Sequence, residues 1–138
     1  MRRLYLDSNV FISLIKREVG RGSRGLFVEA ESFLEAAKKQ DCCIVLSYWF
    51  FAEAYNCCYL NKEEILDYFK DKSIKVEIMP KEGQIPWRDF ANQGLHFSDA
   101  LHAAIALSCK CDCIVTFNVK DFEKIKGRIN VLPPEEFD

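Results

Sequence analysis

The sequence lacks an apolar run long enough to cross a membrane, and its N-terminus lacks the apolar core of a secretory signal. A membrane-spanning helix needs about 18 or more apolar residues, whereas "MRRLYLDSNVF" passes from two arginines directly into a short strand-like run. We therefore expect a cytoplasmic protein that has no membrane among its partners.

The sequence also lacks a strong charge of either sign, because its formal net charge is only -2. It therefore has no overall basic field, and a nucleic-acid partner would need a local basic patch or bound cations. Hydrophobic residues make up 49% of the 138 residues, which is typical of a globular domain with a real core. With no repeat or linker along the chain, we expect residues 1–138 to form one domain.

No two of the seven cysteines have the C-x-x-C spacing of a zinc ribbon, and their odd number excludes a complete disulfide framework. We predict reduced cysteines that act as small buried apolar residues. The sequence also contains no recognisable Ser-His-Asp arrangement and no glycine-rich phosphate loop. Its two histidines, His96 and His102, receive no catalytic role, and we expect His102 to lie at a helix surface or partly buried.

Short β-branched runs alternate with helical segments along the chain, which predicts an α/β domain around a mostly parallel sheet. The strands are expected within residues 2–7, 42–47, 74–79, 113–117 and 129–132. In such sheets, ligands bind beyond the carboxyl ends of the strands. Asp7 directly follows "LYL" at this edge, and Thr116, Asn118 and Asp121 follow "CIVTF".

Two further acids belong to helices that we expect near the same edge. Asp99 stands at the start of the Ala-rich stretch "SDALHAAIALSC", and Glu53 interrupts the apolar segment "SYWFFAEAYNCC", for which Ser47 is a predicted N-cap. Glu is almost never fully buried without a partner, so Glu53 either faces water or meets a positive group, for which a metal ion is the preferred candidate. The aromatic side chains around it are expected in the core or a dimer contact rather than stacked on bases: Trp49, Phe50, Phe51 and Tyr55.

Taken alone, Asp7, Asp99 and Asp121 each have a simpler interpretation as a turn or helix-capping acid. Converging at one edge, however, several acids would repel one another and raise one another's pKa values. Divalent cations offset that repulsion, and oxygen ligands without a His or Cys set favour Mg²⁺ or Mn²⁺. Such a site is suited to phosphodiester hydrolysis, because the metal lowers the pKa of a bound water.

Four segments follow one another along the chain: "LYLDSNVFISLI", "SYWFFAEA", "HFSDALHAAIAL" and "CIVTFNVKDF". In this order they resemble the PIN-domain nucleases, and in particular the small prokaryotic branch of VapC-like toxin ribonucleases. The resemblance runs from residue 4 to about 134. It implies a single Rossmann-like PIN domain with four or five mostly parallel strands. It also implies a Mg²⁺- or Mn²⁺-dependent endoribonuclease that acts on RNA, forms a homodimer and is held inactive by a cognate antitoxin.

Carried over residue by residue, the resemblance makes Asp7, Glu53 and Asp99 the catalytic and metal-binding acids. Asn118 occupies a fourth position where many members have Asp. Two arrangements are therefore open: a single metal ion with Asn118 as a neutral ligand, or a metal site to which Asp121 contributes. The side chains that would orient the acids and their waters are Ser8, Asn9 and Thr116.

The sequence leaves two alternatives to a nuclease open. It also offers one candidate contact with RNA. A haloacid-dehalogenase-like phosphatase also begins with a strand that ends in Asp, but it requires a second acid at the position of Asn9. A non-catalytic PIN-fold module that binds RNA or protein is compatible with Asn118. Arg21 and Arg24, in a glycine-rich loop, would either bind RNA phosphates or simply be solvated.

Overall fold

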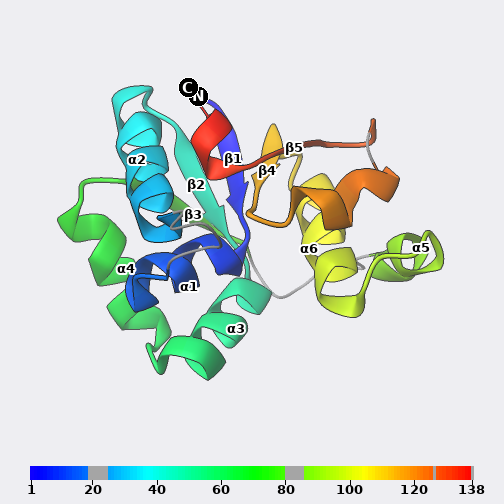
Figure 1. Ribbon diagram of the computed structural model, residues 1–138, viewed down its shortest axis with the longest axis horizontal. Helices are drawn as coiled ribbons and strands as arrows, with labels where there is room; N and C mark the ends of the chain where they lie inside the picture. The colour runs from blue at the N-terminus through cyan, green and yellow to red at the C-terminus, as the bar shows by residue number, and fades with distance from the viewer. Residues whose placement is uncertain (19–24, 80–85, 126, 138) are drawn as a thin grey trace.

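The computed structural model describes residues 1–18, 25–79, 86–125 and 127–137 (Figure 1). The strands are β1 (Arg3–Leu6), β2 (Cys43–Leu46), β3 (Lys75–Ile78), β4 (Cys113–Val115) and β5 (Asn130–Leu132). The α-helices are α1 (Ser8–Lys16), α2 (Leu26–Lys39), α3 (Tyr48–Cys58), α4 (Lys62–Asp71), α5 (Trp87–Asn92) and α6 (Phe97–Ser108). Two 3₁₀ helices complete the described chain, η2 (Val119–Ile125) and η3 (Pro134–Glu136). None of the described helices is long and apolar enough to span a bilayer.

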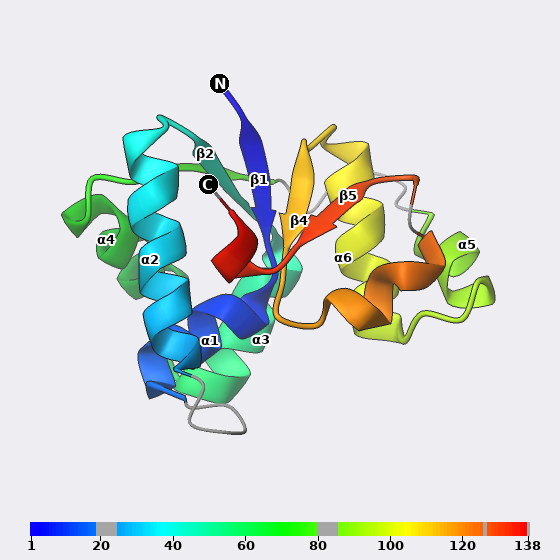
Figure 2. The ribbon, with the colours of Figure 1, turned by 45° about the horizontal axis from the view of Figure 1, so that its top comes forward.

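The five strands form one sheet in the order β3-β2-β1-β4-β5, and every neighbouring pair is parallel. The strand β1 lies at the centre, where Leu4 is in register with Ile44 on one side and Cys113 on the other (Figure 2). The prediction of an α/β domain with a mostly parallel sheet is confirmed. All five carboxyl ends therefore reach the same edge, where the sequence placed the acidic residues.

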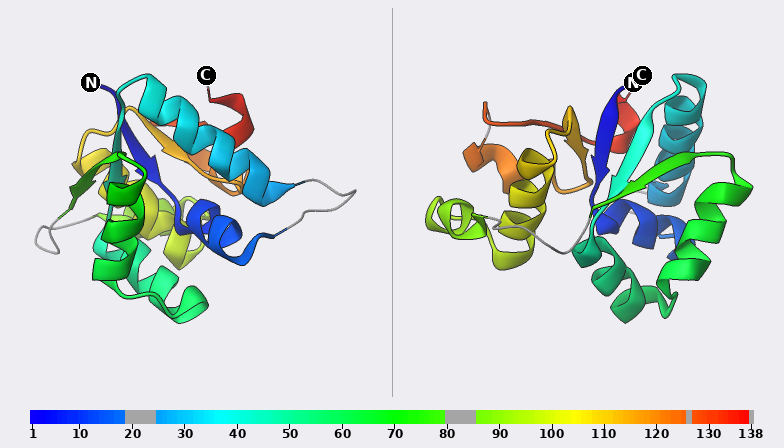
Figure 3. Two further views of the ribbon diagram at one scale, coloured as in Figure 1. Left: turned by 90° about the vertical axis from the view of Figure 1, so that its left-hand side faces the viewer. Right: turned by 180° about the vertical axis from the view of Figure 1, so that it is seen from behind.

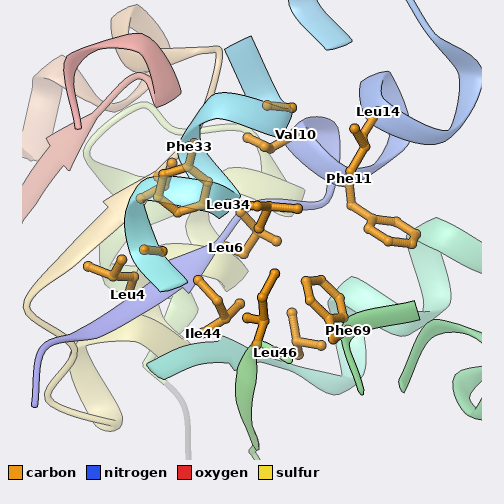
Figure 4. Packing of buried hydrophobic residues seen from close by; sticks show 14 of the residues in the cluster. Leu4, Leu6, Val10, Phe11, Leu14, Phe33, Leu34, Ile44, Leu46 and Phe69 are labelled. Atoms are coloured by element: carbon orange, nitrogen blue, oxygen red, sulfur yellow. The ribbon is translucent and has the colours of Figure 1, made fainter. Parts of the chain in front are cut away.

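The two faces of the sheet carry separate cores because successive side chains in a strand point to opposite faces. On one face, Leu4, Leu6 and Ile44 pack against α1, α2 and α4, as Figure 4 shows for part of this cluster. On the other face, Tyr5 and Val45 pack against α5, α6 and η2. Figure 3 shows the sheet between these two helical layers.

The small residues of α6 explain its close approach to the second face. Four alanines in this helix are buried, and Ile114 of β4 belongs to the same cluster: Ala100, Ala103, Ala104 and Ala106. Four cysteines are buried as well, in agreement with their predicted use as small apolar residues: Cys42, Cys43, Cys109 and Cys113.

The chain enters two of its helices at the carboxyl edge through side-chain caps. The Asp7 carboxylate accepts a hydrogen bond from the backbone N–H of Asn9 at 3.4 Å, and the Ser47 hydroxyl accepts one from Phe50 at 3.1 Å. Each satisfies a backbone donor that the first turn of a helix leaves unpaired. The predicted N-cap at Ser47 is confirmed, and both caps fix where α1 and α3 begin.

The helix α4 begins at a reciprocal capping box. The Asn61 side chain accepts from the backbone of Glu64 at 2.8 Å, while the Glu64 carboxylate accepts from the backbone of Asn61 at 3.1 Å. We expect Asn61→Ala to lower the free energy of unfolding by about 1 kcal/mol. Urea denaturation followed by circular dichroism measures this loss. The matched variant Asp67→Ala, exposed on the same helix, should change the midpoint much less, and equal losses would contradict the role of the cap.

Candidate active site

The Asp7 carboxylate is the centre of the carboxyl edge and is almost fully buried there. Besides capping α1, its Oδ2 accepts a hydrogen bond from the Thr116 hydroxyl at 2.8 Å. Thr116 follows β4, the neighbour of β1, so the parallel register brings these two chain segments together. The carboxylate is thus held in one orientation by donors from two adjacent strand ends.

Asn9 and Thr116 form the support for this arrangement. The Asn9 side chain donates to Thr116 Oγ1 at 3.1 Å and accepts from the backbone N–H of Phe117 at 3.3 Å. The backbone N–H of Asn118 also donates to Thr116 Oγ1, at 3.0 Å. Because Thr116 accepts two hydrogen bonds, its own proton is directed to Asp7. Asn9 and Thr116 therefore hold the Asp7 carboxylate in place, while their role around a metal stays a prediction of the resemblance.

Glu53 points to the same edge from α3 and accepts three hydrogen bonds from side chains. Ser8 donates to Oε1 at 2.9 Å, Ser98 donates to Oε2 at 2.8 Å, and His102 Nε2 lies 2.6 Å from Oε1. Burial acts to raise the pKa of Glu53, but the hydrogen bond and charge of His102, followed by the bonds from Ser98 and Ser8, outweigh it and lower the pKa. Glu53 is therefore a fixed, ionised carboxylate at neutral pH.

His102 is buried, with 1% of its surface exposed, so the expectation of a surface or partly buried residue is wrong. Its Nε2 is directed to Glu53, and its Nδ1 lies 2.5 Å from the Tyr5 hydroxyl, which in turn lies 2.8 Å from Ser47 Oγ. Burial acts to lower the pKa of His102, but the bond to Glu53 and the charges of Asp7 and Glu53 raise it. The partner that Glu53 required within the chain is this histidine.

The sequence contains a pattern that indicates a buried polar role for His102, although the surrounding stretch is rich in alanine. Ser98, Asp99 and His102 recur at helical spacing, so they share one face of α6 in an otherwise apolar stretch. Polar residues grouped on one buried helix face indicate a polar network, which the structure completes through Tyr5 and Glu53.

Asp7, Glu53 and His102 each offer one ligand atom, and these three atoms lie within 4.8 Å of one another. In the segments that the structure describes, no other group of three or more His, Cys, Asp or Glu side chains meets this criterion. Since His102 Nε2 is engaged by Glu53, the carboxylate oxygens of Asp7 and Glu53 are the better candidates for a cation. Such hard oxygen donors fit Mg²⁺ or Mn²⁺.

Asp99 belongs to the first turn of α6 and is outside this three-residue group. The charges of Asp7 and His102 nevertheless act on its carboxyl group. Burial, then the charges of Asp7 and Asp121, raise the pKa of Asp99 to about 6. This mutual destabilisation of carboxylates is the condition that a bound divalent cation relieves. The observed acids therefore fit the metal site that the resemblance implies.

Of the remaining predicted site residues, two are exposed and two lie outside the described part of the chain. Asn118 and Asp121 are exposed near the end of β4, where the backbone N–H of Asp121 donates to the carbonyl of Asn118 at 3.0 Å. Arg21 and Arg24 lie outside the described residues.

Comparison with known proteins identifies the family of this fold and site. The family model of the PIN domain matches residues 4–128, which is most of the chain. The chain belongs to the PIN domain family. The family prediction made from the sequence is thereby confirmed.

Two solved structures share the PIN domain fold over almost their whole length. A chain of a toxin-antitoxin complex from Klebsiella pneumoniae has a TM-score of 0.59 and 24% identity, with 95% of this chain and 97% of that chain covered. A chain of VapBC2 from Rickettsia felis, crystallised with a DNA fragment from its promoter, has a TM-score of 0.62 and 21% identity, with 94% and 96% covered. No curated protein gives a significant match to the chain.

Proposed function

We propose that this PIN domain is a metal-dependent endoribonuclease that hydrolyses RNA phosphodiesters. The observation that carries the proposal is the pair of carboxylates Asp7 and Glu53, each immobilised by hydrogen-bond donors beside Asp99. Catalytic groups that are held in place before the reaction lose no free energy to reorganisation during it. The site is thus built for positioning charge, which is what phosphoryl chemistry requires.

Asp7, Glu53 and Asp99 would hold Mg²⁺ or Mn²⁺, with Asn118 or Asp121 as additional oxygen ligands. When bound, such an ion supplies a water of lowered pKa and neutralises charge on the phosphate. The chain's own contribution is to keep Glu53 ionised and immobile through His102, Ser8 and Ser98. Thr116, itself held by Asn9, fixes the orientation of the Asp7 carboxylate.

The biological setting that we propose is that of a VapC-like toxin with a protein antitoxin as partner, acting in the cytoplasm as a homodimer of one domain over residues 1–138. The support for it is the fold shared with chains of two toxin-antitoxin assemblies and the resemblance of the four sequence segments. A short reading frame immediately upstream of the gene, whose product co-purifies with this chain and inhibits it, is the expected finding. Absence of inhibition by that product would contradict the pairing.

Cleavage of labelled structured RNA tests the catalytic proposal directly. We expect purified protein to cleave in Mn²⁺ or Mg²⁺ and to stop when EDTA is added in excess, with activity restored by further Mn²⁺. A gel of the end-labelled products measures the rate. Activity that persists in EDTA would overturn the metal dependence. RNA that is bound but never cleaved would instead favour the non-catalytic PIN-fold module, with which Asn118 at the fourth acidic position is compatible.

A further inference from the structure

The ring of Phe97 is exposed at the N-terminal end of α6, directly beside the candidate active site. Half of its surface, 50%, is accessible, and it is the one Phe among the large apolar side chains that the described residues expose. The next residue, Ser98, donates to Glu53 at 2.8 Å. An apolar ring therefore stands next to the carboxylates, where solvation alone would favour a polar side chain.

Two tryptophans hold this ring from behind. The Phe97 ring centroid lies 5.6 Å from that of Trp49 at an interplanar angle of 86°, and 5.0 Å from that of Trp87 at 83°. Such edge-to-face contacts fix the orientation of a ring beyond simple burial. Trp49 is in turn fixed, because its indole N–H donates to Ser98 Oγ at 3.0 Å. The exposed face of Phe97 is thus tied to Glu53 through Ser98 and Trp49.

One arginine lies beside this aromatic group. The Arg88 guanidinium lies 5.3 Å from the Trp87 ring and is exposed on α5, which packs against α6. Since the chain as a whole is slightly acidic, general electrostatic attraction to RNA is absent. Stacking of a base on an aromatic ring supplies affinity that does not depend on net charge, and an adjacent arginine supplies a local phosphate contact.

We propose that Phe97, supported by Trp49 and Trp87, is a stacking platform for an unpaired nucleobase of single-stranded RNA next to the cleavage site. A base can lie on the ring only when it is not stacked within a duplex, so the platform selects single strands, loops and bulges. This inference rests on the proposed function, since it names the class of RNA that the site accepts.

The two tryptophans provide a direct probe, because they are the chain's entire tryptophan content and both contact Phe97. Binding is measured in the Asp7→Asn background, where cleavage is not expected to interfere. Adding a single-stranded RNA oligonucleotide should change the tryptophan fluorescence saturably, and the same sequence as a duplex should bind more weakly.

Phe97→Ala in the same background should weaken single-strand binding by about 5- to 100-fold, the range that loss of one base–aromatic stack produces. Phe97→Tyr keeps the ring and should retain the affinity. Tyr55→Ala is the matched control, because Tyr55 is similarly exposed at 57% but lies two residues from Glu53, on another face of α3. It should bind like the parent.

Undiminished binding by Phe97→Ala would overturn the platform, and so would a loss of affinity that accompanies a change from dimer to monomer in sedimentation. Equal losses in Phe97→Ala and Tyr55→Ala would also overturn it. If Phe97-dependent binding is found in a protein that never cleaves RNA, the platform stands and the proposed nuclease fails. If RNA is cleaved without dependence on Phe97, the nuclease stands and the platform fails.

Discussion

Replacing Asp7 with Asn should lower the rate of RNA cleavage by about a thousandfold, the equivalent of about 4 kcal/mol of transition-state stabilisation. The change removes one charge and one strong oxygen ligand at the centre of the sheet edge while keeping the size of the side chain. Loss of this charged ligand should therefore lower the rate of cleavage much more than it lowers the stability of the fold. End-labelled RNA in saturating Mn²⁺ measures the rate.

The fold should tolerate this change because the asparagine can take over the local structural role of Asp7. Its amide oxygen can take the place of Oδ1 and cap α1, and Asn is as favourable as Asp at an N-cap, but the hydrogen bond that Thr116 donates to Oδ2 is lost. Removing the charge also relieves part of the repulsion that, after burial, raises the pKa of Asp99. We expect the free energy of unfolding to fall by no more than about 2 kcal/mol.

The control for Asp7→Asn is Asp112→Asn at the opposite edge of the sheet. The Asp112 carboxylate also accepts a backbone hydrogen bond, from Arg3 at 2.7 Å, but it precedes β4. Asp112→Asn should cleave RNA like the parent. Equal activity of the Asp7→Asn and Asp112→Asn variants would contradict the assignment of Asp7 to catalysis.

Replacing His102 with Leu should lower both activity and stability, because this side chain joins the site to the core. Glu53 would lose its shortest hydrogen bond, and the buried Tyr5 hydroxyl would lose one of its two partners. Loss of a group that orients a metal-binding side chain typically costs 10- to 100-fold in metal affinity or activity, and we expect an effect of that order. The unfolding free energy should fall by about 2–4 kcal/mol.

Two further variants separate positioning from simple destabilisation. His102→Gln retains an N–H donor of similar reach toward Glu53 and should recover part of the Mn²⁺ affinity, measured by electron paramagnetic resonance of free Mn²⁺. His96→Leu is the control, because His96 is exposed at the start of α6 and makes no side-chain capping bond there. Unchanged Mn²⁺ binding and cleavage in His102→Leu would show that Glu53 does not depend on this histidine.

The parallel sheet was predictable because its central strands are short continuous runs of buried apolar residues between helical patterns. "CIVL" and "CIV" occupy β2 and β4, where every residue is buried. Strand order and register were not predictable from these runs, since each is compatible with several partners. They depend on which helices cover each face, and that is a property of the whole chain.

The convergence of Asp7, Glu53 and Thr116 was also predictable, because residues that end parallel strands or begin the following helices must share one edge. The role of His102 was not, because its partners Tyr5 and Glu53 are 97 and 49 positions away in sequence. Burial of a histidine depends on distant groups that satisfy both ring nitrogens. The neighbouring residues in sequence instead favoured a His102 that lies at the surface of an Ala-rich helix or is partly buried there.

The hydrogen-bonded series from Ser47 through Tyr5 and His102 to Glu53 has a consequence for the evolution of the family. The series links three elements, because Tyr5 lies on β1, His102 on α6, and Ser47 and Glu53 in the cap and body of α3. A Phe at position 5 would leave His102 Nδ1 without its partner, so the two positions are coupled energetically. We therefore expect Tyr5 and His102 to covary among relatives, with loss of the phenol accompanied by loss of the imidazole, while the acids that they support stay fixed.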